Sequence, residues 1–266
     1  MNKIAFIGAG NMASAICGGI LSANTILPSD IILYDKFTEQ YSKFNSECNH
    51  ANSIKEAVEF ADYIFFSVKP QNIKDILSEI AKIDISKKVF ISICAGITIN
   101  SIESALGKVK IVRTMPNTPL LIGQGVTALC KNDAVSDDEF AFATSLFATS
   151  GYTTEAKEED INKITAITSS SPAYVYLFVK AMLDGAKKIG FDEENALEMI
   201  CKTIIGSANM ILQDERSVDD LIKMVKSPNG TTERALNVFE DKKFLEIVGE
   251  AMDACAKRAD ELAKLN

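Results

Sequence analysis

Residues 3–13 read KIAFIGAGNMA and decide the fold of the first half of the chain. Residues 3–7 form a short β-rich run, and apolar residues take up helical spacing after Ala13. In a GxGxxA turn between a strand and a helix, Gly8 permits the tight turn and Gly10 lets a pyrophosphate approach the backbone. Ala13 then lets the helix pack closely on the strand. The context predicts a dinucleotide-binding turn.

The second predicted strand, residues 31–35, ends on Asp35, which lies 25 residues after Gly10. An acid at this place usually accepts hydrogen bonds from the adenosine ribose 2′-hydroxyl, which favours NAD. Lys36 follows immediately and could instead meet a 2′-phosphate. The two neighbours indicate opposite preferences, so the sequence leaves both NADPH and NADH open. A solvated strand end is the alternative that needs no cofactor.

Strands and helices alternate over about 155 residues. The strand at 62–68 is a nearly continuous apolar run, as a sheet covered on both faces requires. Lys69 follows this strand, and it falls on the predicted cofactor side because ligands bind beyond the carboxyl ends of parallel strands. Further strand patterns cover residues 88–94, 110–115, 125–130 and 151–154. The alternation predicts an α/β Rossmann domain over residues 1–156, with a doubly wound, mainly parallel sheet.

The second half of the chain has a different pattern. From Glu158 onward the spacing is helical and no convincing strand remains, with apolar faces over residues 174–189, 197–212 and 245–262. The face at 197–212 is hard to bury inside so small a domain, so we expect a subunit interface there. The sequence therefore predicts an all-α domain over residues 157–266 that mediates dimerisation.

Composition excludes several classes of protein. A net charge of −8 and a pI near 4.9 argue against a nucleic-acid partner, because no basic patch is available for phosphates. No charged-then-apolar leader precedes the first strand, and no apolar run reaches membrane-spanning length. We therefore expect a cytoplasmic protein with no membrane partner.

The cysteines and the single histidine indicate neither a metal site nor a disulfide frame. The cysteines are scattered without a CxxC pair, which is typical of small buried thiols in a reducing compartment. They are Cys17, Cys48, Cys94, Cys130, Cys201 and Cys255. His50 lies in a polar stretch, where a surface or capping role is expected.

A second motif, SPNGTT at residues 227–232, lies between two helical patterns. Asn229 and Gly230 tolerate positive φ, and Thr231 or Thr232 is expected to cap the following helix. A glycine turn that leads into a helix N-terminus offers free N–H groups to a small anion. An ordinary helix–helix turn would have the same sequence features, so the loop alone leaves both interpretations open.

No familiar acid–base or nucleophilic motif accompanies these two features. The chain has no GxSxG elbow, no P-loop lysine motif and no metal-spaced set of His, Cys and carboxylate residues. A bound cofactor must then supply the chemistry, while protein groups position a small acidic substrate. A C=N substrate suits the chain better than a carbonyl, because an iminium is already charged and needs no evident proton donor.

Five motifs together resemble the pyrroline-5-carboxylate reductase family: GAGNMA at 8–13, VKPQ at 68–71, RTMPNTP at 113–119, SSSPAY at 169–174 and SPNGTT at 227–232. The resemblance covers essentially the whole chain. It implies reduction of 1-pyrroline-5-carboxylate to L-proline with NAD(P)H, the last step of proline biosynthesis. It also implies a helical C-terminal domain that intertwines in a dimer, and some family members assemble into decamers.

The resemblance also implies site residues beyond Asp35 and Lys36, which the position after the second strand already indicates. The expected cofactor residues are Gly8, Ala9, Gly10, Asn11, Met12, Asp35, Lys36, Asn52, Val68, Lys69, Pro70, Ala95 and Gly96. The expected substrate residues are Met115, Pro116, Asn117, Glu215, Asn229, Gly230, Thr231 and Thr232. Backbone N–H groups at Gly230, Thr231 and Thr232 would bind the substrate carboxylate. The Thr232 hydroxyl would be the catalytic group near the imine nitrogen, and Glu215 matches a family position close to the substrate in the partner subunit's cleft.

Some positions depart from the family pattern. Ser169 and Asn229 each replace a glycine, and Lys223 stands where the family often has Asp. Asn tolerates the left-handed conformation better than other non-glycine residues, so the loop at 227–232 is expected to form. Asp35-Lys36 also departs from the Asn-Arg or Ser-Arg pair of many NADP-preferring members.

Two other functions remain open from the sequence. A reductase of the same two-domain plan could act on another cyclic imine or on a β-hydroxyacid. A hydroxyacid enzyme would place a catalytic lysine early in the second domain, where this chain has Ser170, Ser171 and Tyr174. A non-catalytic dinucleotide-binding protein would leave the loop at 227–232 without a ligand.

Overall fold

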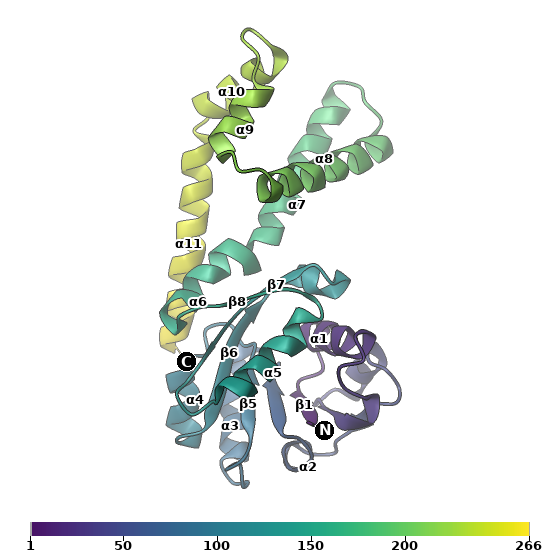
Figure 1. Ribbon diagram of the computed structural model, residues 1–266, viewed down its shortest axis with the longest axis vertical. Helices are drawn as coiled ribbons and strands as arrows, with labels where there is room; N and C mark the ends of the chain where they lie inside the picture. The colour runs from purple at the N-terminus through teal and green to yellow at the C-terminus, as the bar shows by residue number, and fades with distance from the viewer. Residues whose placement is uncertain (1, 266) are drawn as a thin grey trace. The chain divides into compact units, whose positions relative to one another are not determined.

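The structure is a computed structural model, and it describes residues 2–265 (Figure 1). Its contacts divide the chain into two compact units, Met1–Pro172 with Ala254–Asn266, and Ala173–Asp253. We call them the sheet unit and the helical unit. The division does not fall at 156/157, because helix α6 (Glu158–Ile164) buries Ile161 completely in the core beneath the sheet. The domain boundary between residues 156 and 157 that the sequence predicts stays a prediction.

The described part of the sheet unit contains an eight-stranded sheet, in the order β3-β2-β1-β4-β5-β6-β7-β8. The pairing of β6 with β7 is antiparallel, since the short connection between them leaves no room for a crossover helix, and the other pairings are parallel. The mainly parallel sheet is therefore confirmed. The strands are β1 Ile4–Ile7, β2 Ile31–Tyr34, β3 Asn49–His50, β4 Tyr63–Phe66, β5 Val89–Ser92, β6 Lys110–Pro116, β7 Gly125–Lys131 and β8 Gly151–Glu155.

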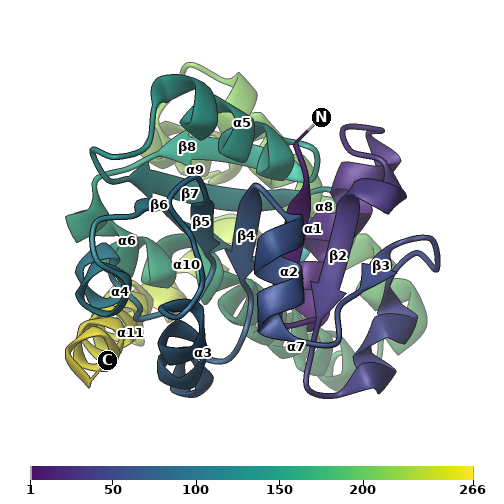
Figure 2. The ribbon, with the colours of Figure 1, turned by 90° about the horizontal axis from the view of Figure 1, so that it is seen from below.

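Helices cover both faces of this sheet (Figure 2). Side chains alternate across each strand, so Ile4 and Phe6 of β1 join one core, and Ala5 and Ile7 join the other. Two helices pack on the first face, α1 Asn11–Ser22 and α5 Asp137–Ala148. Four pack on the second, α2 Ile54–Phe60, α3 Ile73–Ile80, α4 Ile99–Leu106 and α6. Burial on both faces explains the continuous apolar runs of the strands.

After β8 the described residues form helices and no strand, as predicted. A π-helical turn, Thr165–Ser169, follows α6. The remaining helices are α7 Ser171–Lys188, α8 Glu193–Gln213, α9 Val218–Val225, α10 Thr231–Asp241 and α11 Phe244–Leu265. Helix α11 contributes residues to both units, because its first part lies before the break at Asp253 and its last part lies after it.

Helix α8 carries the wide apolar face that the sequence predicts. Leu212 is 83% exposed, and Ile205 and Ile211 are about half exposed in this single chain. Only the small Ala196 and Ile200 are buried on this helix. Contiguous exposed apolar surface of this kind is typical of a subunit interface. Over residues 2–265, none of the helices combines the length and apolar character needed to cross a bilayer.

The short edge strand β3 was not predicted. Its residues Asn49 and His50 are exposed and polar, so neither an apolar run nor an alternation marks them. The His50 ring stacks on the Tyr41 ring with centroids 4.3 Å apart, which agrees with the predicted surface role.

The four cysteines of the Rossmann region are buried, as expected for small hydrophobic side chains. Burial raises the pKa of the Cys94 thiol to about 11 and has the same effect on Cys130. Both thiols are therefore neutral near pH 7 and unreactive. Cys201 and Cys255 are only partly exposed.

Candidate cofactor and substrate sites

The turn between β1 and α1 has the geometry that the GxGxxA motif predicts. Gly8 has a φ of +101°, and a Cβ there would lie 2.6 Å from the Ser67 carbonyl oxygen. A Cβ at Gly10 would meet nothing within 4 Å. The first glycine is thus required by the close approach of the next strand end, and the second leaves the backbone open to a ligand.

Helix α1 begins without a side-chain cap. Gly10 is its N-cap, no side chain accepts from the first N–H groups, and no acid lies in the first turn. These N–H groups have no intrahelical partner, and the helix dipole favours an anion in front of them. Lys43 adds positive charge, since its Nζ donates to Asn11 Oδ1 over 2.8 Å. The start of α1 therefore suits a pyrophosphate, and Lys43 is a neighbour that the sequence analysis missed.

Asp35 lies just after β2, where the sequence places it, and two backbone N–H groups hold its carboxylate. The Ala9 N–H donates to Oδ2 over 2.7 Å, and the Phe37 N–H donates to Oδ1 over 2.9 Å. The Asp35 N–H in turn donates to the Tyr41 hydroxyl over 3.0 Å. Each carboxylate oxygen keeps a lone pair for a ribose hydroxyl. Lys36 is exposed beside it.

The VKPQ motif meets the glycine turn. The Ser67 hydroxyl donates to the Gly8 carbonyl over 2.6 Å, and Val68 Cγ1 would lie 2.7 Å from a Cβ on Gly8. Lys69 follows as an exposed side chain, and Pro70 opens a short 3₁₀ turn. The structure therefore brings two of the predicted motifs into direct contact.

Two further predicted cofactor positions lie at neighbouring strand ends. Ala95 is exposed after β5, and Gly96 has a φ of +72°. Since β4 and β5 are adjacent and parallel, these residues lie at the same edge of the sheet as Val68. Asn52 precedes α2, where its N–H and Nδ2 both donate to Glu56 Oε2, over 2.7 and 3.2 Å.

The predicted substrate residues at 115–117 are buried in the sheet unit. Met115 belongs to the core, and both the nitrogen and the oxygen of the buried Asn117 side chain make hydrogen bonds. Its Nδ2 donates to the Thr168 carbonyl over 3.0 Å, and its Oδ1 accepts from the Val126 N–H over 2.8 Å. The structure gives Asn117 a bracing role, and a substrate contact of residues 115–117 stays a prediction.

The loop at 227–232 adopts the predicted turn, with one correction. Asn229 has a φ of +56°, so it is left-handed, as the sequence requires. A Cβ on Gly230 would collide with the Ser227 hydroxyl oxygen. The expectation of a threonine cap was wrong: Gly230 is the N-cap, and helix α10 begins at Thr231 without a side-chain cap. The extended backbone of Gly230 places both threonines inside the first turn.

The N–H groups of this loop are not all free. The Gly230 N–H donates to the Ser227 carbonyl over 3.0 Å, so it is not the free donor that we expected. The N–H groups of Thr231 and Thr232 open the helix and have no intrahelical acceptor. The two threonine N–H groups are therefore the donors that remain for an anion.

Glu233 is a charged neighbour of the loop that the sequence analysis missed. Its Oε2 accepts from the Asn229 N–H over 2.8 Å, and its Oε1 lies 3.5 Å from Lys226 Nζ. These two interactions stabilise the turn and keep the Glu233 carboxylate directed toward Asn229 and Lys226. Thr232 is half-buried and lines an apolar groove of about 290 Å³ with Leu221 and Leu236. Glu215 is exposed between α8 and α9.

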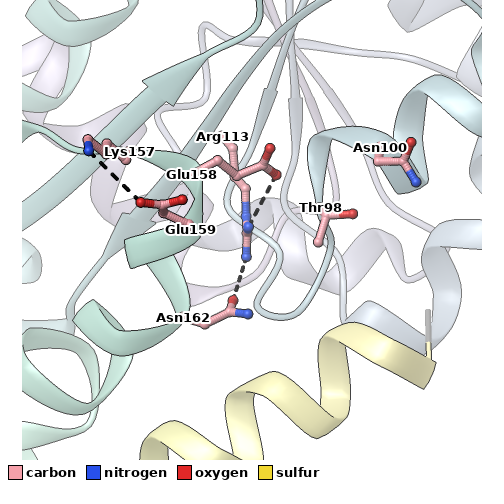
Figure 3. A pocket seen from close by; sticks show the side chains of 7 residues that line it. All are labelled: Thr98, Asn100, Arg113, Lys157, Glu158, Glu159 and Asn162. Atoms are coloured by element: carbon pink, nitrogen blue, oxygen red, sulfur yellow. Dashed lines mark hydrogen bonds and ion pairs between the residues drawn. The ribbon is translucent and has the colours of Figure 1, made fainter.

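A polar cavity of about 600 Å³ in the sheet unit contains none of the predicted site residues (Figure 3). Its lining residues are Thr98, Asn100, Arg113, Lys157, Glu158, Glu159 and Asn162. Arg113, the first residue of the RTMPNTP motif, has a side chain that is only 2% exposed. Burial lowers the pKa of its guanidinium, and the nearby Glu158 carboxylate opposes that change.

Family models match both halves of the chain. The model described as pyrroline-5-carboxylate reductase dimerisation matches residues 158–262. The model described as NADP oxidoreductase, coenzyme F420-dependent, matches residues 3–96. These matches agree with a nucleotide-binding first half and a helical second half.

Relatives match over nearly the full length. The pyrroline-5-carboxylate reductase of Escherichia coli strain K12 is 37% identical over 267 residues, with 98% of each chain covered. That of Pseudomonas aeruginosa is 38% identical over 266 residues, with 98% of this chain and 97% of the relative covered. The crystal structure of Plasmodium falciparum pyrroline carboxylate reductase with NADP bound has 32% identity and a TM-score of 0.92, with 98% of each chain covered.

Proposed function

The chain belongs to the pyrroline-5-carboxylate reductase family and is a reductase of proline biosynthesis, and we propose that it reduces 1-pyrroline-5-carboxylate to L-proline with NADPH or NADH. The observation that carries the residue assignments is that α1 and α10, which each follow a glycine-bearing turn, begin without a side-chain cap. An uncapped helix start binds small anions. A reductase of an acidic imine needs one such place for the cofactor and one for the substrate.

The residues around α1 fit a dinucleotide. The N–H groups of Asn11 and Met12 hold the pyrophosphate, Gly10 keeps its approach open, and Gly8 permits the tight turn against Ser67. When bound, a reduced nicotinamide supplies the hydride that the C=N carbon accepts. The remaining cofactor residues lie along the carboxyl ends of neighbouring strands, and they are Asn52, Val68, Lys69, Pro70, Ala95 and Gly96.

Opposite charges act on the choice between NADH and NADPH. Asp35 keeps lone pairs for a ribose 2′-hydroxyl and repels a 2′-phosphate, which favours NADH. Lys36 is exposed beside Asp35 and favours NADPH. Lys43 is held at Asn11 by a 2.8 Å hydrogen bond and has no carboxylate partner in residues 2–265, and we propose that its charge also acts on a 2′-phosphate. We therefore assign both cofactors to this enzyme.

The start of α10 fits the substrate carboxylate. The N–H groups of Thr231 and Thr232 donate to the carboxylate, and the helix dipole adds to the attraction. The Thr232 hydroxyl, or a water that it holds, makes a hydrogen bond to the ring nitrogen. Asn229 and Gly230 shape the turn that presents these donors. Glu215 and the segment 115–117 stay predicted neighbours of the substrate.

A hydroxyacid substrate is less well supported. Such a reaction needs an acid–base group, and the first lysine along α7 is Lys180, at the middle of the helix. Its Nζ donates to the Asp184 carboxylate over 2.9 Å on an exposed helix face. A lysine paired with a solvent-exposed carboxylate in this way is an ordinary surface ion pair. Residues 165–179, which lead into and form the first half of this helix, contain no lysine, and this favours a C=N substrate.

Assembly and location complete the proposal. The dimerisation model covers α7 to α10, and α8 exposes Leu212 and its apolar neighbours, so we assign the homo-oligomer interface to the helical unit. A cytoplasmic location fits a biosynthetic reductase in which the four cysteines of the Rossmann region are free, buried thiols.

A single assay tests the proposed function. The purified chain is mixed with NADPH or NADH and pyrroline-5-carboxylate, and the loss of reduced nicotinamide is followed by absorbance. We expect rapid oxidation of the cofactor and formation of proline. Preferential reduction of a cyclic imine without a carboxylate would contradict the proposal. Preferential oxidation of a β-hydroxyacid in a parallel assay with NADP⁺ or NAD⁺ would also contradict it, and so would binding of the cofactor without any turnover.

A further inference from the structure

The loop after β5 is in contact with the C-terminal turn of α11. Gly96 is buried, with a φ of +72°, and a Cβ there would lie 3.1 Å from Leu262 Cβ and 3.2 Å from the Leu262 carbonyl carbon. Both residues belong to the sheet unit. The helix backbone and the loop backbone therefore touch with no room for a side chain between them.

The same loop is fixed on its other side by one carboxylate. Glu158 Oε1 accepts from the N–H of Ile99, the first residue of α4, over 2.7 Å. It also accepts from Arg113 Nη1 over 3.3 Å. Ile99 lies three residues after Gly96, so Glu158 ties the end of the loop to β6 and α6. This capping contact satisfies a helix N–H that would otherwise have no partner.

Arg113 and Asn162 link Glu158 to Asp260 of α11 through hydrogen bonds. Arg113 Nη2 donates to Asn162 Oδ1 over 2.7 Å, and Asn162 Nδ2 donates to Asp260 Oδ1 over 3.0 Å. Figure 3 shows the guanidinium of Arg113 between Glu158 and Asn162. Asp260 lies two residues before Leu262, on the helical turn that touches Gly96. The contacts thus form a closed ring that starts and ends at the loop.

We propose that the C-terminal turn of α11, through Asp260 and Leu262, positions the Ala95–Gly96 loop for cofactor binding. The inference rests on the proposed function, which gives Ala95 and Gly96 a place in the cofactor site. Asp260 itself is exposed, so it is a positioning residue rather than a core residue. Its removal leaves no buried charge and no cavity, but it releases Asn162 and loosens the ring.

Titration of the full-length protein with NADPH tests this role, with nicotinamide fluorescence as the readout. Asp260→Ala should raise the Kd for NADPH about threefold to tenfold, the loss expected for one hydrogen bond. The kcat at saturating NADPH should stay within about twofold of the wild type, because the chemistry of the site is untouched. The melting temperature should not change. Asp260→Asn keeps an oxygen acceptor for Asn162, so it should bind NADPH as the wild type does.

Glu261→Ala is the matched control. Glu261 is the next residue on the same turn, and its carboxylate pairs with Arg258 on the helix surface, over 2.6 Å. Its loss should leave the Kd for NADPH unchanged. Gly96→Ala should weaken NADPH binding more than Asp260→Ala, since it strains a positive φ and pushes against Leu262.

Three results would overturn the inference. The first is an unchanged Kd in Asp260→Ala. The second is an equal loss in Asp260→Asn, and the third is a lower melting temperature that accompanies and accounts for the weaker binding. A wild-type protein that binds NADPH but does not reduce pyrroline-5-carboxylate would contradict the proposed function instead, and the comparison of Kd values would still stand.

Discussion

The starts of α1 and α10 have nearly the same backbone but very different surroundings. Gly10 has φ −79° and ψ −175°, and Gly230 has φ −81° and ψ 171°; neither helix has a side-chain cap. At α1 the packed sheet fixes the turn, since Gly8 lies against Ser67 and Val68. At α10 short-range hydrogen bonds from within the loop and its first turn do so.

The difference in surroundings matches the difference in proposed task. The pyrophosphate takes no part in the reaction of the substrate, so a rigid turn that is part of the core suits it. A carboxylate on a reacting ring must be placed beside a hydroxyl that acts during the reaction, and Thr232 would supply both an N–H and that hydroxyl in the proposed mechanism. Substitutions at the two helix starts should therefore change different kinetic constants.

The largest effect is expected at Thr232. Thr232→Ala should lower kcat by about a hundredfold, the order found when one donor to a transition state is removed. Thr232→Ser keeps the hydroxyl and should retain most of the activity. Steady-state kinetics at saturating NADPH give the comparison, and circular dichroism checks that the fold is kept. An unchanged kcat in Thr232→Ala would remove this hydroxyl from the mechanism.

The next effect is expected at Gly10. Gly10→Ala places a methyl group where the structure has open space, so stability should stay close to that of the wild type. The methyl group would meet the pyrophosphate, so the KM for NADPH should rise at least about tenfold. Gly8→Ala is the contrasting variant, because it collides with Ser67 and should lower the melting temperature as well. Equal melting temperatures for the two variants would contradict the distinction.

A smaller effect is expected at Asn229. Asn229→Ala must hold a left-handed φ of +56° without a side chain that tolerates it, which costs about 1 kcal/mol. The KM for pyrroline-5-carboxylate should rise severalfold, while the KM for NADPH should not change. Asn229→Gly restores the family residue and should match or exceed the wild type. A higher KM for NADPH in Asn229→Ala would mean that the loop does not serve the substrate.

The smallest effect is expected at Lys43. Lys43→Gln removes the charge near Asn11 and should raise the KM for NADPH about threefold to fivefold, in the range of a single exposed charge contact. The KM for NADH should change less. The ratio of the two KM values, measured at low ionic strength, is the readout. Equal changes for both cofactors would assign Lys43 to the pyrophosphate instead of the 2′-phosphate.

Local patterns explain what could be predicted from the sequence. The glycine turn, the buried strands and the left-handed Asn229 follow from short-range steric rules, and each is confirmed. The edge strand β3 escaped prediction because two exposed polar residues carry no periodic signal. The threonine cap was wrong because the backbone of Gly230, rather than a hydroxyl, sets the first residue of α10.

Long-range contacts explain what could not be predicted. Lys43 reaches Asn11 across 32 residues of sequence, and Asn162 reaches Asp260 across 98. No spacing rule links such pairs, because the sheet and α11 bring them together only in three dimensions. Glu233 is different, since it lies four residues from Asn229, and an acid in the first turn of α10 was a signal available in the sequence.

The most direct measurement compares pyrroline-5-carboxylate with 1-pyrroline, the same ring without the carboxylate, at saturating NADPH. If the start of α10 binds the carboxylate through Thr231 and Thr232, kcat/KM should be at least about a hundredfold higher for pyrroline-5-carboxylate, since hydrogen bonds to a charged group contribute about 1.5–3 kcal/mol each. Equal kcat/KM values for the two rings would contradict a carboxylate site at this helix start.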